Sequence, residues 1–322
     1  MMDWTDRHCR YFLRQVAPRV RLYTEMITTA ALLHGDRERL LAYHPDEHPL
    51  AVQLGGSEPD DLARCARWAE QAGYDEVNLN VGCPSDRVQS GRFGACLMLE
   101  PEHVADCVRA MRDAVALPVT VKCRIGVDEQ DSYAALAAFV SGLVEAGLSQ
   151  LTVHARKAWL QGLSPKQNRD IPPLQYEQVY RLKQDFPDLP VSINGGITSA
   201  AAVVAHLAHV DGVMLGRAAY HDPWLLVAVE SQLLPGAVVG TTRHDVARAM
   251  LPYIEEAMRH GVRLQQVVRH MLGLFQGQPG AKAWRRYLSE HAHRDGAGVE
   301  VVERALAKVP EKSDVPAVAG NR

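Results

Sequence analysis

The chain has 322 residues, of which 47% are hydrophobic and 23% charged, so it can bury a core and wholesale disorder is excluded. No apolar run approaches the ~20 residues that span a bilayer, and the polar start at Met1–Asp6 carries no secretory signal; we therefore expect a cytoplasmic protein without membrane association. The net charge of −3 conceals a basic segment, residues 243–294, with nine Lys or Arg against four Asp or Glu. Such a segment suggests a polyanionic partner, although a solvated helix face is the plainer interpretation.

Short apolar runs alternate with amphipathic segments through most of the chain. The expected strands are Arg21–Thr24, Leu50–Leu54, Glu76–Val81, Val119–Lys122, Leu151–His154, Val191–Asn194 and Gly212–Leu215. The expected helices between them are Asp60–Gln71, Glu102–Ala116, Asp131–Glu145, Gln175–Asp185 and Ser199–Ala208, with starts signalled by Ser57, Asp131 and Thr198-Ser199 and ends by Gly73 and Gly147. This alternation predicts a parallel sheet, and seven strands in one series favour an α/β fold of the (β/α)8 TIM-barrel type over a doubly wound sheet.

The two ends of the chain differ from this pattern. Met1-Met2-Asp3-Trp4 looks like the loop after a first strand, so we expect that strand to be truncated, for example by a late start codon. After Pro235, helical periodicity replaces the strand signals. It covers Asp245–His260, Leu264–Leu274 and Ala281–His293. We expect a barrel domain at residues 1–234, a linker at 235–242, a small all-helical domain at 242–307 and a disordered tail at 308–322.

Polar residues end most of the expected strands, and in a parallel barrel these ends meet at the catalytic face. They are Gln53, Asn78 with Asn80, Lys122 with Arg124, His154 with Arg156, Asn194-Gly195-Gly196 and Gly216-Arg217. The last two groups end neighbouring strands, where barrels often bind phosphate through loop N–H groups and a helix N-terminus. Ordinary turn glycines are the alternative.

Three side chains at this face could carry chemistry. Lys122 would hold an anionic ring or a carbonyl, unless it pairs with a buried acid. His154 could donate a hydrogen bond to a cofactor or substrate carbonyl, or be structural. Cys83 lies in Asn80-Val81-Gly82-Cys83-Pro84, a tight loop that could present its thiol as a general acid; a buried packing residue is the alternative. The six cysteines show no Cys-x-x-Cys and no zinc-like spacing, so we expect neither a disulfide framework nor a metal site.

Two segments combine cations with aromatic residues. Residues 154–169 carry Arg156, Lys157, Lys166 and Arg169 with Trp159 and no acid, and residues 282–287 repeat the mixture. On a helix, Lys282 and Arg285 share a face. Either segment alone fits a solvated surface, but two of them on an acidic protein favour an RNA partner.

Together these motifs resemble the tRNA-dihydrouridine synthases over Met1 to about Ala307. The motifs are Met2-Asp3-Trp4-Thr5-Asp6, Gln53-Leu54-Gly55-Gly56, Asn78-Leu79-Asn80-Val81-Gly82-Cys83-Pro84, Val121-Lys122-Cys123-Arg124, His154-Ala155-Arg156, Asn194-Gly195-Gly196-Ile197 and Gly216-Arg217. Further segments resemble the DusA subfamily, which acts on positions 20 and 20a. They are Leu22-Tyr23-Thr24-Glu25-Met26, His154–Trp159 with Gly162–Lys166, and Gly280–Arg286.

The resemblance implies that reduced FMN, replenished by NADPH or NADH, passes hydride from N5 to C6 of a uridine in the tRNA D-loop, while Cys83 protonates C5. It implies that FMN is bound by Met1, Met2, Gln53, Lys122, His154, Asn194, Gly195, Gly196, Gly216 and Arg217. It implies that Asn80 contacts the target base and that tRNA is positioned by Lys166, Arg169, Lys282 and Arg285. We expect a monomer.

Two other functions remain open at this stage. A barrel enzyme similar to a dihydroorotate dehydrogenase would explain the phosphate loops, Lys122 and Cys83, but not the basic helical segment. A non-catalytic tRNA-binding protein on a decayed barrel would explain that segment, but not the intact Cys83, Lys122 and His154.

Overall fold

The computed structural model describes residues 1–233 and 241–311. They form two compact units. The first contains residues 1–3, 21–197 and 201–216; the second contains residues 4–20, 198–200 and 217 onward. The packing therefore groups residues 217–233 with the C-terminal helices, whereas the sequence places them in the barrel domain. The domain boundaries expected from the sequence stay a prediction.

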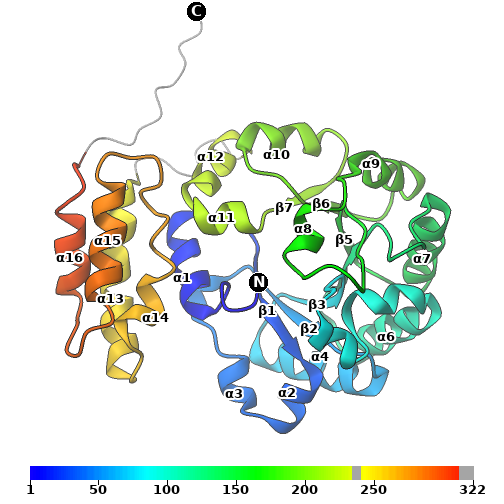
Figure 1. Cartoon of the computed structure of the whole chain (residues 1–322). Coiled ribbons are helices and arrows are strands. Elements are labelled where there is room, and N and C mark those ends of the chain that lie inside the picture. The colour runs from blue at the N-terminus through cyan, green and yellow to red at the C-terminus, as the bar shows by residue number, and fades with distance from the viewer. Residues whose placement is uncertain (234–240, 312–322) are drawn as a thin grey trace, which may run out of the picture. The chain divides into compact units, whose positions relative to one another are not determined.

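A single sheet of seven parallel strands builds the first unit. The strands follow one another in chain order and curve into the barrel-like sheet of the (β/α)8 class (Figure 1). They are β1 Leu22–Thr28, β2 Leu50–Gly55, β3 Glu76–Val81, β4 Val119–Arg124, β5 Gln150–His154, β6 Val191–Asn194 and β7 Gly212–Met214. The fold class and the position of every expected strand are confirmed.

Helices cover the outside of this sheet, one after most strands (Figure 1). The larger ones are α4 Pro59–Ala72, α6 Pro101–Ala114, α7 Tyr133–Glu145, α9 Tyr176–Asp185 and α10 Ala200–Leu207. Shorter pieces are α2 Thr29–His34, α3 Arg37–Leu40, η1 Pro45–Glu47, α5 Asp86–Ser90, η2 Gly94–Leu99 and α8 Gln167–Asp170. The five expected helices are confirmed.

Two of the expected helix caps are wrong. Glu58, not Ser57, precedes α4, and it makes no side-chain cap bond; Pro59 is the first helical residue. Ser132, not Asp131, caps α7 by accepting from Ala135 N. The expected end at Gly73 is confirmed, since it closes α4 in the left-handed conformation with φ of 90°.

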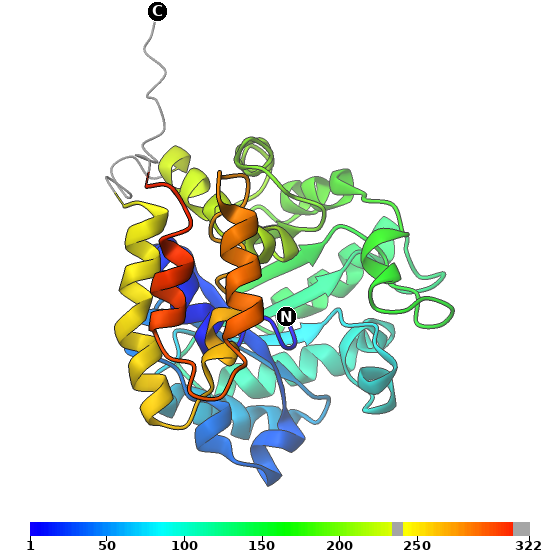
Figure 2. The same ribbon diagram turned by 60° about the vertical axis from the view of Figure 1, so that its left-hand side comes forward.

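The second unit is helical (Figures 1 and 2). Its helices are α1 Arg7–Val16, α11 Arg217–His221, α12 Trp224–Leu233, α13 Arg243–Arg259, α14 Leu264–Val268, α15 Ala281–His291 and α16 Glu300–Leu306. The helix expected at Leu264–Leu274 ends at Val268, and α16 was not expected. The expected linker, apart from residues 241 and 242, and most of the expected tail, residues 312–322, lie outside the described residues. Of the tail, Val309 is described and buried.

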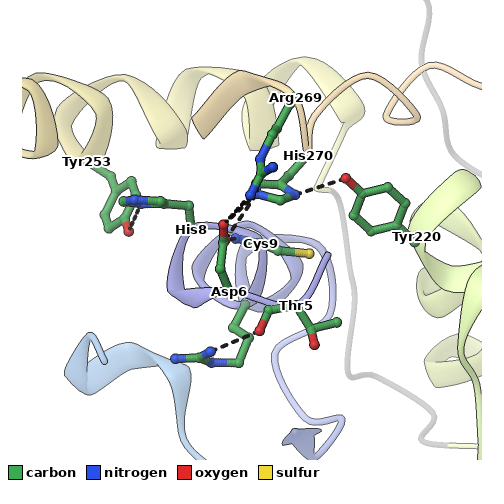
Figure 3. A network of polar contacts seen from close by, with 9 residues as sticks. Thr5, Asp6, His8, Cys9, Tyr220, Tyr253, Arg269 and His270 are labelled. Atoms are coloured by element: carbon green, nitrogen blue, oxygen red, sulfur yellow. Dashed lines mark hydrogen bonds and ion pairs between the residues drawn. The ribbon is translucent and has the colours of Figure 1, made fainter. Parts of the chain in front are cut away.

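A polar cluster joins distant segments of the second unit (Figure 3). Asp6 caps α1 by accepting from Cys9 N, and it also binds Arg269 at 2.7 Å and His270 at 3.1 Å. Burial opposes the charge of Asp6, but the bonds and charges of His270 and Arg269 outweigh it and hold its pKa below the usual range.

No helix in the described parts of the chain has the length and apolar character that crossing a membrane requires.

Candidate active site

Polar side chains occupy the inner face of the sheet towards the carboxyl ends of the strands. Neighbouring strands pair Asn80 with Lys122, Arg124 with His154, and His154 with Asn194. Because alternate residues of a strand share a face, Lys122 and Arg124 point to the same side of β4. The residues expected at the strand ends therefore come together on one edge of the sheet.

The loop that carries Cys83 is held from three directions. The Asn80 side-chain oxygen accepts from Gly82 N at 3.1 Å and from Cys83 N at 3.0 Å. The buried Arg124 donates to the Gly82 carbonyl at 2.9 Å, and Ala95 N donates to the Cys83 carbonyl at 2.9 Å. The half-buried Cys83 thiol donates to the Ser85 hydroxyl at 3.6 Å. A fixed backbone with an accessible thiol suits proton transfer to a bound substrate.

The charged side chain of Lys122 is largely buried near the carboxyl end of β4. Burial first, and then the charge of Arg124, lower the pKa of Lys122 to about 8. Among the described residues no carboxylate or hydrogen-bond acceptor pairs with its ammonium group, so they give no support to the interpretation of Lys122 as the partner of a buried acid. The buried acid of this sheet, Glu76, pairs instead with Arg21. Lys122 is thus available to a ligand with electron-rich atoms.

His154 lies near Lys122 at the edge formed by the carboxyl ends of the strands. Burial, followed by the charges of Lys122 and Arg124, holds its pKa far below the usual value, so its imidazole is neutral at neutral pH. No side-chain hydrogen bond of His154 is found within the described residues. A neutral imidazole can donate one N–H to a carbonyl or ring nitrogen, which is the role expected from the sequence.

The loop after β6 is shaped to receive an anion. Gly195 and Gly196 have φ of 117° and 69°, and a Cβ on Gly195 would lie 2.7 Å from His154. Their N–H groups find no acceptor among the described residues, whereas the Gly195 carbonyl accepts from Tyr176 at 2.7 Å. The Asn194 amide donates to the Met214 carbonyl at 2.7 Å. Free N–H groups at a strand end are the donors that a phosphate needs.

The remaining residues expected to bind the flavin differ in their position and exposure. A Cβ on Gly216 would lie 3.7 Å from Met1 Sδ, so the exposed Met1 lies at the carboxyl end of β7. Met2 is also exposed. Gln53 donates to Asn78 at 2.8 Å. Arg217 starts α11 and belongs to the second unit, so the geometry of the first unit does not include it.

The four cations of the expected RNA-contacting segment differ in their surroundings. Lys166 and Arg169 are exposed at α8. Lys157 instead binds Asp131 at 2.9 Å and lies 4.1 Å from the Trp159 ring centroid. Arg156 likewise donates to the backbone carbonyls of Asp170 and Pro172. Two of the four cations therefore hold the loop itself together: Lys157 pairs with an acid outside the segment, and Arg156 donates to backbone carbonyls.

The expected helix face in the second unit exists. Lys282 is exposed on α15, and Arg285, one turn further on, donates to Gln276 at 2.7 Å. Trp284 between them is fully buried and donates to the Met271 carbonyl at 3.1 Å, so it is a core residue rather than a stacking platform.

Sequence reasoning gave no role to Glu76 and Thr120 beneath this edge, and it gave Asn78 only a place among the strand-end residues. Glu76, Asn78 and Thr120 are buried and linked through hydrogen bonds to Gln53 and Asn80. A signal was present, since Glu76, Asn78 and Asn80 alternate with apolar residues and so share one face of β3.

A curved parallel sheet with unbonded glycine N–H groups, a buried lysine and an accessible thiol at its carboxyl edge has the arrangement of a barrel enzyme. Comparison with known proteins makes this specific. A family model described as dihydrouridine synthase (Dus) matches residues 1–310, and the chain belongs to this family.

Similar proteins named tRNA-dihydrouridine(20/20a) synthase cover nearly the whole chain. The protein of Shewanella oneidensis is 60% identical over 309 residues, 96% of this chain and 92% of its own length. That of Vibrio parahaemolyticus is 57% identical over 316 residues, 98% and 97% of the two chains. That of Salmonella typhimurium is 58% identical over 313 residues, 97% and 94%.

Proposed function

We propose that the protein reduces the C5–C6 double bond of uridines 20 and 20a in the D-loop of tRNA, giving 5,6-dihydrouridine. The names and high identity of its relatives support this substrate. The observation that carries the proposal is the Cys83 thiol, held on a loop pinned by Asn80 and Arg124 next to the unpartnered Lys122. We further propose a cytoplasmic monomer that takes its reducing equivalents from NADPH or NADH.

The described residues fit FMN as the cofactor. The free N–H groups of Gly195 and Gly196 suit its phosphate, together with Asn194, Gly216 and Arg217. Lys122, His154 and Gln53 would hold the ring, with Met1 and Met2 beside it. When bound, the flavin supplies the hydride that reduces C6 of the uracil.

The protein's own chemistry is the delivery of one proton. Addition of hydride at C6 requires a proton at C5, and the Cys83 thiol can give it, leaving a thiolate that solvent reprotonates. Lys122, whose charge lies near Cys83, stabilises that thiolate while it exists. Asn80 contacts the base and at the same time holds the N–H groups of the loop.

The tRNA would be held by cations of both units. Lys166 and Arg169 in the first unit and Lys282 and Arg285 in the second offer charge to phosphates. The uridine has to leave its stack to reach the strand ends, at a cost of a few kcal/mol. Phosphate contacts remote from the base offset this cost.

The Cys83→Ala substitution tests the proposal. We expect the variant to keep FMN and its reduction by NADPH but to form dihydrouridine at least a hundredfold more slowly, because the proton donor is gone. The matched control is Cys96→Ala, which removes another half-buried free thiol and should leave the rate unchanged. Undiminished product from Cys83→Ala would remove Cys83 from this role. If only free pyrimidines were reduced, the tRNA substrate would be wrong.

A further inference from the structure

A row of hydrogen bonds runs across the strands β2, β3 and β4, from the buried Glu76 at the start of β3 to the Cys83 loop. Its five side chains, here called the polar row, are Glu76, Thr120, Asn78, Gln53 and Asn80. Thr120 donates to Glu76 at 2.5 Å, and Asn78 donates to Thr120 at 2.8 Å. Gln53 donates to Asn78 and Asn80 donates to Gln53, each at 2.8 Å. Every bond in the row points the same way.

The end of the row at the Cys83 loop fixes one orientation. The N–H groups of Gly82 and Cys83 can only donate, so the Asn80 atom that faces them has to be its oxygen. The NH2 group of Asn80 then faces Gln53, whose oxygen must accept. By the same rule Gln53 donates to Asn78, and Asn78 donates to the Thr120 hydroxyl.

The other end requires the same orientation independently. A carboxylate can only accept, so the Thr120 hydroxyl has to donate to Glu76 and receive from Asn78. Glu76 is completely buried, and Arg21 at 2.5 Å with Tyr23 at 3.0 Å keeps its carboxylate paired. Every donor and acceptor in the row finds a partner only if the end away from Cys83 is an acceptor, which is the Glu76 carboxylate. Hydrogen bonds aligned in one direction also strengthen one another.

We propose that Glu76, acting through Thr120 and Asn78, is the positioning residue that sets the amide orientation of Gln53 and Asn80. This inference rests on the proposed function and deepens it. Because the Asn80 oxygen already accepts two backbone N–H groups, Asn80 can offer a substrate only its remaining N–H. It therefore selects a carbonyl oxygen on the base and holds the Cys83 loop at the same time. Glu76 touches neither substrate nor thiol.

Thr120→Val tests the proposal, since it cuts the row with little change in volume. In the FMN-loaded protein we expect the Gly82 and Cys83 amide protons to exchange with solvent at least tenfold faster, as followed by NMR. Amides of β6 such as Ile193 should be unaffected. The kcat for dihydrouridine in tRNA should fall at least tenfold, with little change in the KM for tRNA.

The conservative variant Thr120→Ser keeps the hydroxyl and should restore both readouts. If Thr120→Ser behaves like Thr120→Val, packing rather than the hydrogen bond matters and the proposal is overturned. Wild-type exchange in Thr120→Val overturns it too. Should Thr120→Val fail to fold, Glu76→Met decides, because it removes the acceptor altogether; faster exchange is expected, and wild-type exchange would contradict the proposal. A wild-type protein that forms no dihydrouridine would refute the proposed function. The exchange rates would still show whether the polar row holds the Gly82 and Cys83 amides in place.

Discussion

Lys122 shows how one residue can cost stability and serve a ligand. Its pKa is lowered to about 8 in the folded chain from 10.5, so the unfolded chain binds its proton more tightly. Between about pH 8 and 10.5 this residue therefore makes folding more favourable as the pH rises. Below pH 8 it carries the full cost of a buried charge, and a bound anionic or electron-rich ring would relieve that cost.

Lys122→Met should for this reason stabilise the FMN-free protein while weakening FMN binding. We expect the free energy of unfolding at pH 7 to rise by about 2 kcal/mol, a gain that shrinks towards pH 10. Urea unfolding at the two pH values measures the first effect, and flavin fluorescence titration the second.

Lys183→Met is the control for this prediction. Lys183 pairs with Asp211 at 2.9 Å, so its loss should destabilise the chain instead. A less stable Lys122→Met protein with unchanged FMN affinity would contradict the role given to Lys122.

At the residue scale, the sequence was informative where a motif marked a strand end. It could identify Cys83, Lys122 and His154 as neighbours because parallel strands bring their ends together. It could not find the link from Glu76 to Asn80, because that link depends on the register between β2, β3 and β4. Nor could it show that Lys157 is neutralised by Asp131, since the two lie on different loops.

At the scale of elements, α15 is the clearest case of a helix with two faces. Trp284 and Leu288 are buried in the second unit, while Lys282 is exposed. Lys282 and the half-buried Arg285 lie one turn apart on this helix, at a spacing that suits phosphates along an RNA backbone.

Changing Lys282 and Arg285 together to Glu should weaken tRNA binding at least tenfold and reduce its salt dependence, because phosphate contacts release counterions. FMN content should not change. Arg286→Glu is the control on the same helix, since Arg286 lies 4.0 Å from Glu290 in an exposed pair. Binding measured at several salt concentrations by filter retention tests this, and an unchanged affinity would place tRNA recognition elsewhere.

The elements that the sequence predicted least well are the helices of the second unit. The helix α1 has the right spacing of buried residues at Cys9, Phe12, Leu13 and Val16, but its three arginines and its place near the chain start concealed it. The helix expected to reach Leu274 stops at Val268 because Met271 and Leu274, although buried, lie in turns. Apolar spacing reports burial, not the backbone conformation that achieves it.

At the scale of the whole molecule, contacts between distant parts of the sequence hold the second unit together. Asp6 binds Arg269 and His270, more than 260 positions later (Figure 3). Because the pKa of Asp6 is held below its unfolded value, this cluster stabilises the fold above about pH 4 and loses its effect as the pH falls further.

Asp6→Asn should lower the free energy of unfolding at pH 7 by about 2 kcal/mol, since it leaves the buried His270 and the exposed Arg269 with a weaker acceptor. The difference from wild type should narrow below pH 4. Chemical unfolding at pH 7 and pH 3.5 measures both. Asp245→Asn is a control, because that carboxylate caps α13 on the surface. A difference that persisted undiminished at low pH would show that the charge of Asp6 is not its contribution.

The most direct test of the whole account is dihydrouridine formation itself. Purified protein is incubated with FMN, NADPH and tRNA from cells that lack dihydrouridine, and the product is quantified and mapped by mass spectrometry. We predict dihydrouridine at positions 20 and 20a, dependent on both NADPH and Cys83. A flavin-loaded, NADPH-reducible protein that leaves this tRNA unmodified would contradict the account.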